Sequence, residues 1–282
     1  MFDLAIFTHI ALGVVQGLTE FLPVSSSGHL ILAHELVGSA GGASDLAFDA
    51  LLHFATALAI ILYFRHDLWR LTRTLWSLPF FPSNRITGDE KVEDGTSHDR
   101  ELLYALIVGT IPAVVLGLLL ENILATLFRN PLLVAAALVV GSGIMFVGER
   151  YQRGLYTYTA HVSAWGRGLI IGLFQSLALI PGMSRSGMTI SGGLLLGMNR
   201  TSAARFGFLL GIPLFLGAGA KKALEIGLGE ITLSMFGGTA AAFVVALLVI
   251  HFLLKFLRNH TLYVFVAYRL ALAALIVALV VL

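Results

Sequence analysis

The chain of 282 residues contains no cysteine, and only 12% of its residues are charged. Without cysteine it forms no disulfide framework and holds no thiolate nucleophile or cysteine-ligated zinc. A soluble domain has about 25% charged residues, so this chain has too little charge to cover the surface of a globule of its size. Disorder is excluded too, because 57% of the residues are hydrophobic. The composition therefore predicts an all-α, polytopic membrane protein.

The sequence also lacks the basic segments that two other classes require. It has no cluster of Lys and Arg with interleaved aromatic residues, so nucleic acid is not an expected partner. The first residues have no basic segment and include Asp3, which is atypical of a cleaved signal peptide. The expected partner is instead the lipid bilayer.

Six segments are apolar enough to cross a bilayer, which takes about 20 helical residues. The segment Leu46–Phe64 can cross the bilayer only if Asp49 and His53 face the protein interior. Pro213 is expected to kink the segment Ala203–Ala220. Residues 65–101 are polar and are predicted to form a solvated loop. The six predicted spans are Leu46–Phe64, Leu102–Leu120, Pro131–Gly148, Ala203–Ala220, Ile231–Leu254 and Leu262–Leu282.

Two further regions, residues 4–37 and 168–198, do not fit a simple span. Each contains an apolar run, a short Pro, Ser and Gly segment, and a second apolar run too short to cross. Paired short segments interrupted by Gly and Pro are the signature of broken or re-entrant helices. Non-helical backbone at membrane depth persists only where it is buried in protein or lines a wet cavity. We therefore predict two re-entrant helix hairpins.

The two interrupted regions align with each other at an offset of 159 residues. Gln16 then matches Gln175, and the segment Ser25–Gly28 falls on Ser184–Gly187. The shared Gln twelve residues before the Gly makes a chance match of Ser and Gly less plausible. We interpret the alignment as an internal duplication.

The duplication predicts a single membrane domain over residues 1–282, with one repeat over about 1–148 and the other over about 166–282. Each repeat holds one hairpin and three spans. Because three is odd, the second repeat must be inverted relative to the first. The two hairpins then enter from opposite sides, and their tips meet near the midplane.

The basic residues agree with this topology, since cytoplasmic loops of membrane proteins are rich in Lys and Arg. If the 65–101 loop is cytoplasmic, 13 Lys and Arg residues lie inside, 3 lie outside and 2 lie in the membrane. Both termini are then extracytoplasmic. The inside residues are Arg65, Arg70, Arg73, Arg85, Lys91, Arg100, Arg150, Arg153, Arg167, Arg200, Arg205, Lys255 and Arg258; those outside are Arg129, Lys221 and Lys222; those in the membrane are Arg185 and Arg269.

The hairpin tips carry polar groups that are costly at membrane depth and are therefore functional candidates. Ser precedes a short helix in both tips, and Ser is a preferred N-cap residue. Free N–H groups and the helix dipole make such helix starts anion sites, and Arg binds phosphate through two parallel hydrogen bonds. We expect a phosphate cradle at the two tips. Its predicted substrate-binding residues are Gln16, Ser25, Ser27, Gly28, Ser184, Ser186 and Gly187, with Arg185 between the helix starts.

Glu20 lies one helical turn after Gln16, and its carboxylate next to a phosphate requires a cation between them. Mg²⁺ or Ca²⁺ suits this position, because both prefer oxygen ligands and are often held by one or two carboxylates plus substrate phosphate. Ser26 could attack phosphorus if His29 took its proton; alternatively His29 could attack, or activate a water. The sequence does not decide between them.

Four other features have a structural interpretation, and one of them also has a functional interpretation. Asp49 and His53, four residues apart, either line the same cavity or form a structural pair. The two GxxxG motifs, Gly13 with Gly17 and Gly193 with Gly197, are expected to pack helices together. Arg269 in the last span is expected to pair with an interior acid.

These motifs resemble those of the undecaprenyl-diphosphate phosphatase family, also called the bacitracin-resistance proteins. The resemblance rests on GVVQGLTEFLPVSSSGH at residues 13–29 and PGMSRSGMTISGG at residues 181–193, and it extends to LYALIVGTIPAVVLG at residues 103–117. The family hydrolyses undecaprenyl diphosphate to the monophosphate, which recycles the lipid carrier of cell-wall synthesis. The resemblance thus implies a divalent-cation-dependent phosphatase of the bacterial inner membrane, with its site open to the periplasm.

The family's functional positions can be matched residue by residue. Its acidic motif falls on Gln16 and Glu20, its catalytic Ser and His on Ser26 and His29, and its phosphate-binding Arg on Arg185. Many relatives have Glu where this chain has Gln16, whose amide can bind a metal through its carbonyl oxygen but adds no charge. The expected metal ligands are therefore Glu20 and Gln16.

The architecture alone favours a different class, a secondary transporter or flippase of a lipid phosphate or other anion, because inverted repeats with broken helices are typical of transporters. Phosphate release by protein in detergent separates the two classes, since transport needs a sealed membrane. The sequence leaves the oligomeric state open, and a homodimer is compatible with it. It also leaves the metal and the isoprenoid length open.

Overall fold

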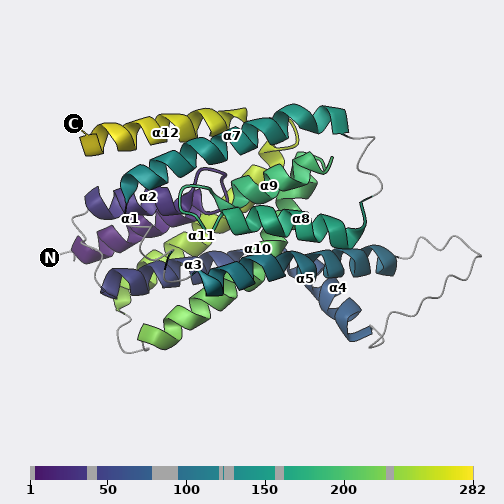
Figure 1. The fold of residues 1–282 in the computed structure, drawn as a ribbon. Coiled ribbons are helices and arrows are strands. Elements are labelled where there is room, and N and C mark those ends of the chain that lie inside the picture. The colour runs from purple at the N-terminus through teal and green to yellow at the C-terminus, as the bar shows by residue number, and fades with distance from the viewer. Residues whose placement is uncertain are drawn as a thin grey trace, which may run out of the picture.

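A computed structural model describes residues 4–36, 43–77, 95–120, 123, 130–155, 162–226 and 232–281. These residues are helical apart from turns and short connections (Figure 1). The helices are α1 (Leu4–Thr19), α2 (Ser26–Leu36), α3 (Ala43–Tyr63), α4 (Arg65–Ser77), α5 (Gly95–Leu119), α7 (Pro131–Leu155), α8 (Ala164–Leu177), α9 (Arg185–Leu195), α10 (Arg200–Ile226), α11 (Leu233–Phe256) and α12 (Tyr263–Val281).

Four helices of the described chain are long and apolar enough to cross a membrane, namely α5, α7, α11 and α12. They coincide with four of the six predicted spans. The predicted span in α10 lies in a continuous helix of 27 residues that runs through Pro213. The chain is thus an all-helical, multi-pass membrane protein. Arg85, Lys91 and Arg129, which entered the charge argument, lie outside the described residues.

The predicted solvated loop over residues 65–101 is wrong at both of its ends. Its first part forms α4, which bends away from α3 by 79°, and its last part forms the start of α5. Charged residues hid a helical pattern in α4: Trp69 and Trp76, seven residues apart, lie on one exposed face, while Leu71 and Thr74 are buried. α3 is apolar enough to count toward a span only when it is taken together with α4 as a bent pair.

The two interrupted regions form two helix pairs, α1 with α2 and α8 with α9. Figure 1 shows the pairs coming from opposite ends of the molecule, with their connecting loops close together in the middle. α1 begins and α12 ends at the same end of the molecule. α2 and α9 begin exactly one repeat offset apart, at Ser26 and Arg185.

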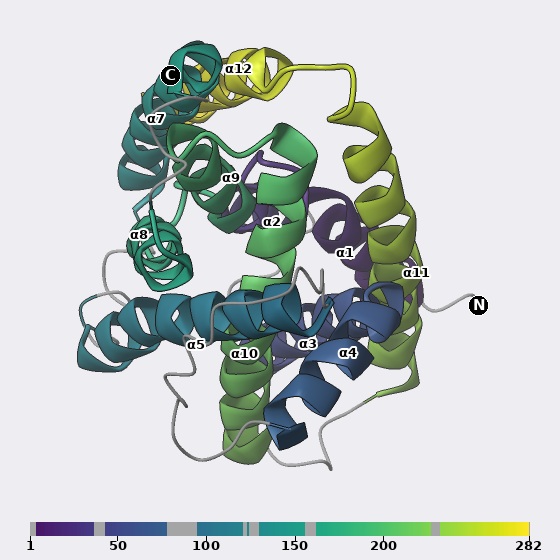
Figure 2. The ribbon, with the colours of Figure 1, turned by 90° about the vertical axis from the view of Figure 1, so that its right-hand side faces the viewer.

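Each pair packs against a long helix of the other half of the chain. α1 packs on α11 and α8 packs on α5, while α3 packs on α10 and α7 on α12 (Figure 2). Glycine permits the closest contacts: a Cβ atom at Gly13 would lie 2.0 Å from the Gly238 carbonyl oxygen, and one at Gly172 would lie 2.2 Å from that of Gly109. The packing role predicted for the first GxxxG motif is thereby confirmed.

The second GxxxG motif has a split role. Gly193 packs tightly against Ala203, as predicted, because a Cβ atom there would lie 2.6 Å from the Ala203 Cβ. Gly197 instead ends α9 in a left-handed conformation, with φ of 75°. The N–H groups of Met198 and Gly197 donate to the carbonyl oxygens of Gly193 and Leu194, which is the Schellman pattern of helix termination.

Candidate functional site

The first tip joins α1 to α2 over residues 20–25. Ser25 adopts a positive φ of 75°, which is uncommon for a residue other than glycine and stores about 1–3 kcal/mol of strain. Its hydroxyl lies 3.2 Å from that of Ser27. α2 begins at Ser26, so the tip directs the first turn of a helix toward the centre of the molecule.

The second tip repeats this conformation at the equivalent positions. Ser184 has a φ of 71°, and its hydroxyl lies 3.3 Å from that of Ser186. Ser184 caps α9, as predicted, by accepting a hydrogen bond from the Gly187 N–H at 3.2 Å. The Gly187 N–H is therefore used within the cap.

The tips are bonded to each other. The Ser186 hydroxyl donates to the carbonyl oxygen of Leu22 in the first tip at 3.1 Å. In return, the N–H of Gly182 in the second tip donates to the Ser27 hydroxyl at 3.4 Å. Two serines of the predicted cradle thus hold the tips in a fixed relation, so groups carried by different tips can act together.

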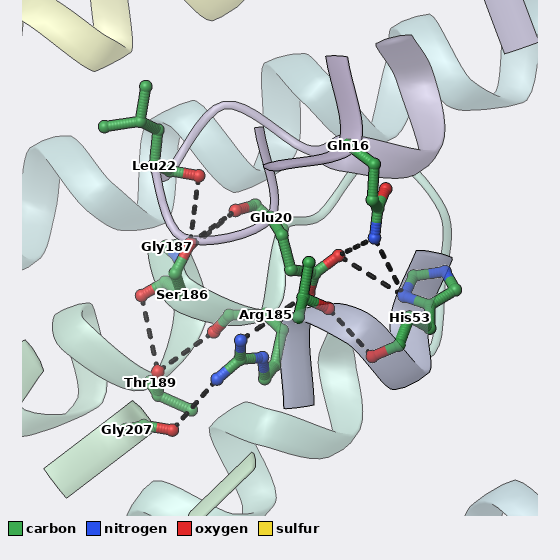
Figure 3. Close-up of polar contacts among 11 residues, drawn as sticks. Gln16, Glu20, Leu22, His53, Arg185, Ser186, Gly187, Thr189 and Gly207 are labelled. Atoms are coloured by element: carbon green, nitrogen blue, oxygen red, sulfur yellow. Dashed lines mark hydrogen bonds and ion pairs between the residues drawn. The ribbon is translucent and has the colours of Figure 1, made fainter. Parts of the chain in front are cut away.

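A buried polar cluster lies at this junction (Figure 3). The Gln16 Nε2 donates to the Glu20 carboxylate at 2.8 Å and lies 3.1 Å from the His53 Nδ1, which is itself 3.4 Å from Glu20. Arg185 reaches the same carboxylate from the second tip, with Nη2 3.5 Å from Glu20 Oε1. The structure thus brings three predicted site residues together with His53 from α3.

Arg185 keeps hydrogen-bonding capacity in this cluster. Its Nη1 donates to the Gly207 carbonyl oxygen at 3.0 Å, whereas Nε is buried without a hydrogen-bond acceptor among the described residues and Nη2 has only the ion pair with Glu20 at 3.5 Å. Its guanidinium also lies over the ring of Phe215, 4.4 Å from the centroid. A positioned guanidinium with free N–H groups can bind an anion such as phosphate.

Ser26 and His29 lie on the first turn of α2. Ser26 begins this helix directly after the tip that carries Glu20. The His29 ring is held by the Ser25 carbonyl oxygen, 2.8 Å from Nδ1, and by the Tyr268 hydroxyl, 2.7 Å from Nε2. His29 is therefore oriented by α12, whereas Glu20 contacts Gln16, His53 and Arg185.

The expectation for Arg269 is wrong, because this fully buried residue forms no ion pair in the described part of the chain. Its guanidinium donates instead to the Ser142 hydroxyl and to the carbonyl oxygens of Leu138 and Gly182, at 3.1, 3.2 and 2.8 Å. The bond to Gly182 ties α12 to the second tip. Arg269 therefore acts through hydrogen bonds that fix the tip rather than through an acid.

Asp49 and His53 also differ from a simple pair. Asp49 lies 3.0 Å from the His34 Nε2, while His53 lies in the Glu20 cluster, so each of the two has another partner. Sequence reasoning missed Tyr268 altogether. No local motif marks Tyr268, which reaches His29 only because α12 folds back beside the tips.

The cluster has a donor set that suits a divalent cation in part. The Gln16 Oε1 is buried without a hydrogen-bond donor, and the Glu20 carboxylate lies next to it. The described residues contain no group of three or more His, Asp or Glu side chains arranged as metal ligands. An oxygen-seeking ion held here would therefore take one carboxylate and one amide oxygen from the protein, and its remaining ligands from phosphate and water.

Comparisons with known proteins show relatives that match nearly the whole chain. The family model described as bacitracin resistance protein BacA matches residues 9–275. A relative from Desulforudis audaxviator named undecaprenyl-diphosphatase is 40% identical over 275 residues, which is 97% of this chain and 98% of the relative. One from Moorella thermoacetica with the same name is 40% identical over 95% of both chains, and "Undecaprenyl-diphosphatase 2" from Stutzerimonas stutzeri is 40% identical over 96% of both.

Proposed function

This chain belongs to the bacitracin resistance protein BacA family, and from that premise we propose that it is a membrane phosphatase that hydrolyses undecaprenyl diphosphate. The observation that carries the proposal is the junction of the tips, where Arg185 and Glu20 meet in a buried cluster, and where α2 begins at Ser26. The reaction releases undecaprenyl phosphate and phosphate, recycling the lipid carrier of cell-wall synthesis and supporting bacitracin resistance.

The proposed topology has six spans and two re-entrant hairpins in an inverted repeat. The reciprocal packing of α1 on α11 and of α8 on α5 supports it, as does the equal backbone conformation of Ser25 and Ser184. The excess of 13 over 3 basic residues supports a cytoplasmic position for α4 and an outer position for both termini. The first tip, with Glu20, then opens toward the periplasm of the bacterial inner membrane.

In this proposal the diphosphate binds between the tips, with its prenyl chain among the lipid-facing helices. The unbonded N–H groups of Arg185 donate to the phosphate oxygens, and the first turn of α2 presents its positive dipole end. Charge that develops on the phosphoryl group is stabilised most strongly by such fixed donors in a water-poor site.

A divalent cation, Mg²⁺ or Ca²⁺, would be held by Glu20 and by the Gln16 Oε1. When bound, it would neutralise phosphate charge beside the carboxylate. His53 and Gln16 orient that carboxylate through their contacts at 3.4 and 2.8 Å. Removal of the metal by a chelator is expected to abolish phosphate release, and addition of Mg²⁺ or Ca²⁺ to restore it.

We assign the attacking group to Ser26, because it begins α2 directly after the tip that carries Glu20, whose carboxylate can accept the proton. Its oxygen bonds to the terminal phosphorus while the bond from that phosphorus to the bridging oxygen breaks, and undecaprenyl phosphate leaves. Water then cleaves the phosphoserine and releases phosphate. His29, held between Ser25 and Tyr268, is the alternative nucleophile, and direct attack by water is the other.

The decisive experiment measures phosphate release from isoprenyl diphosphates of several chain lengths by the purified protein in detergent, with the metal titrated. The proposal expects turnover without a sealed membrane. No phosphate release at any metal concentration would favour the transporter alternative. Acid-quenched protein is then analysed by mass spectrometry: phosphate on Ser26 supports the assignment, phosphate on His29 refutes it, and turnover without any phosphoprotein favours water.

A further inference from the structure

A cavity of about 500 Å³ lies apart from the tips, where α3, α4, α10 and α11 meet. It is lined by residues at the end of α3, at the start of α10 and at the end of α11. These helix termini gather at the end of the molecule that carries α4, which faces the viewer in Figure 2. The cavity is within the size range of about 300–1,000 Å³ that is typical of small-ligand sites.

The cavity has an excess of positive charge. Arg205, Lys255 and Arg258 line it, while Asp67 is its one acidic lining residue, giving a net charge of +2 from three cations and one anion. Asp67 is already paired with Arg205 at 2.8 Å and with Arg70 at 2.6 Å. Among the described residues, neither Lys255 nor Arg258 pairs with an acid. The cavity is therefore suited to an anion.

Hydrogen-bonding and apolar groups complete the lining. The Tyr63 hydroxyl lies 3.2 Å from the His251 Nδ1, and both can bond a phosphate oxygen. Leu254 and Phe64 add apolar side chains to the lining. A ligand that fits both parts has a charged head and an apolar remainder, as an anionic lipid does.

The helices around the cavity indicate that it lies at the level of the membrane surface. α4 bends from α3 by 79°, and its exposed Trp69 and Trp76 are typical of a helix that lies at the interface between headgroups and acyl chains. The cavity borders α4 through Asp67 and therefore opens at headgroup level. Basic pockets between membrane helices on the cytoplasmic side are suited to lipid headgroups with phosphate.

We propose that this cavity, lined by Arg205, Lys255 and Arg258, is a binding site for the phosphate headgroup of an anionic membrane lipid. The site is separate from the tip cluster and independent of the phosphatase reaction. The same chemistry would accept a free phosphate ion, so the test must separate the two sources.

The test titrates purified full-length protein in a neutral detergent with short-chain phosphatidylglycerol, and native mass spectrometry counts the bound lipid. Parallel titrations use phosphatidylcholine and inorganic phosphate. The variant Lys255→Gln/Arg258→Gln removes two cavity cations, and Arg100→Gln/Arg150→Gln removes two exposed cations outside the cavity. A cation near an anionic surface contributes roughly fivefold in affinity, so the cavity variant should bind phosphatidylglycerol about 25-fold more weakly.

The control variant should bind phosphatidylglycerol as the wild type does, and phosphatidylcholine should bind weakly to all three proteins. Equal losses in both variants would overturn the proposal, because the binding would then follow total charge. Unchanged binding in the cavity variant would overturn it as well. Displacement of the lipid by an equal concentration of inorganic phosphate would assign the cavity to a soluble ion and refute the lipid site. Matching thermal unfolding curves establish that each variant is folded.

Discussion

The two tips share one backbone design but divide the chemistry between them. Ser25 and Ser184 have nearly the same positive φ, and each is followed by a short helix. Yet Ser26 of the first tip corresponds to Arg185 of the second, and Glu20 corresponds to Leu179, in each case at the offset of 159 residues. The two tips thus have similar backbones that carry different side chains, and the proposed site depends on that difference.

The buried glutamines show the same division. Gln16 and Gln175 are both fully buried and occupy equivalent positions. Gln16 is bonded to Glu20 and lies beside His53, whereas both polar atoms of the Gln175 amide lack a hydrogen-bond partner in the described chain. A buried amide without a hydrogen-bond partner lowers the stability of the fold by about 1–3 kcal/mol. The second half thus keeps Gln175 without the partners that stabilise Gln16 in the first half.

The largest effect should follow from breaking the asymmetry at Glu20 or Arg185. Glu20→Gln and Arg185→Ala are each expected to lower kcat by about 10²–10³-fold, because each removes a fixed charge from the site of phosphoryl transfer. Phosphate release from undecaprenyl diphosphate in detergent is the measurement. Leu179→Ala, at the position equivalent to Glu20, is the matched control and should stay near wild type. Full activity in both charge variants would sink the proposed site.

The close helix contacts of the two halves, α1 with α11 and α8 with α5, can be disrupted as well. Gly13→Val and Gly172→Val should each destabilise the fold by about 3 kcal/mol or more, because the new side chain meets a carbonyl oxygen that cannot move aside. Thermal unfolding in detergent measures the change. Gly143→Ala, where a Cβ atom has nothing within 4 Å, is the control and should stabilise the helix by about 0.5–1 kcal/mol. A stable Gly172→Val variant would contradict the tight α5–α8 contact.

A smaller effect should separate His53, which contacts Glu20, from His34, which contacts Asp49. His53→Ala is expected to lower kcat by about tenfold and to raise the metal concentration needed for half-maximal rate, since it frees the Glu20 carboxylate from one partner. His34→Ala, which removes the partner of Asp49 instead, should leave the metal requirement unchanged. An unchanged metal requirement in His53→Ala would show that His53 does not position this carboxylate.

The tips could be predicted from local patterns, because every signal lies within a few neighbouring residues. These signals are the interruptions by Pro, Gly and Ser, the helix caps, and the Glu and Arg within apolar segments. Four spans followed from the length of apolar runs alone. The partners of Glu20 and His29 were less accessible: His53 and Tyr268 come from α3 and α12, and only tertiary packing brings them to the tips. α4 was missed for another reason, since its charges concealed an exposed face with Trp69 and Trp76 and a buried face with Leu71 and Thr74.

The smallest expected effect concerns the reciprocal bonds between the tips. Ser186→Ala removes a bond of 3.1 Å to the Leu22 carbonyl oxygen, and Ser27→Ala removes one of 3.4 Å from the Gly182 N–H. Ser186→Ala should lower the free energy of unfolding by about 1 kcal/mol and Ser27→Ala by less, because the longer bond is weaker. Thermal unfolding of the single and double variants measures both. If the tips are held as a unit, the double variant loses more or less than the sum of the single losses, whereas strict additivity would mean that each bond stabilises only its own tip.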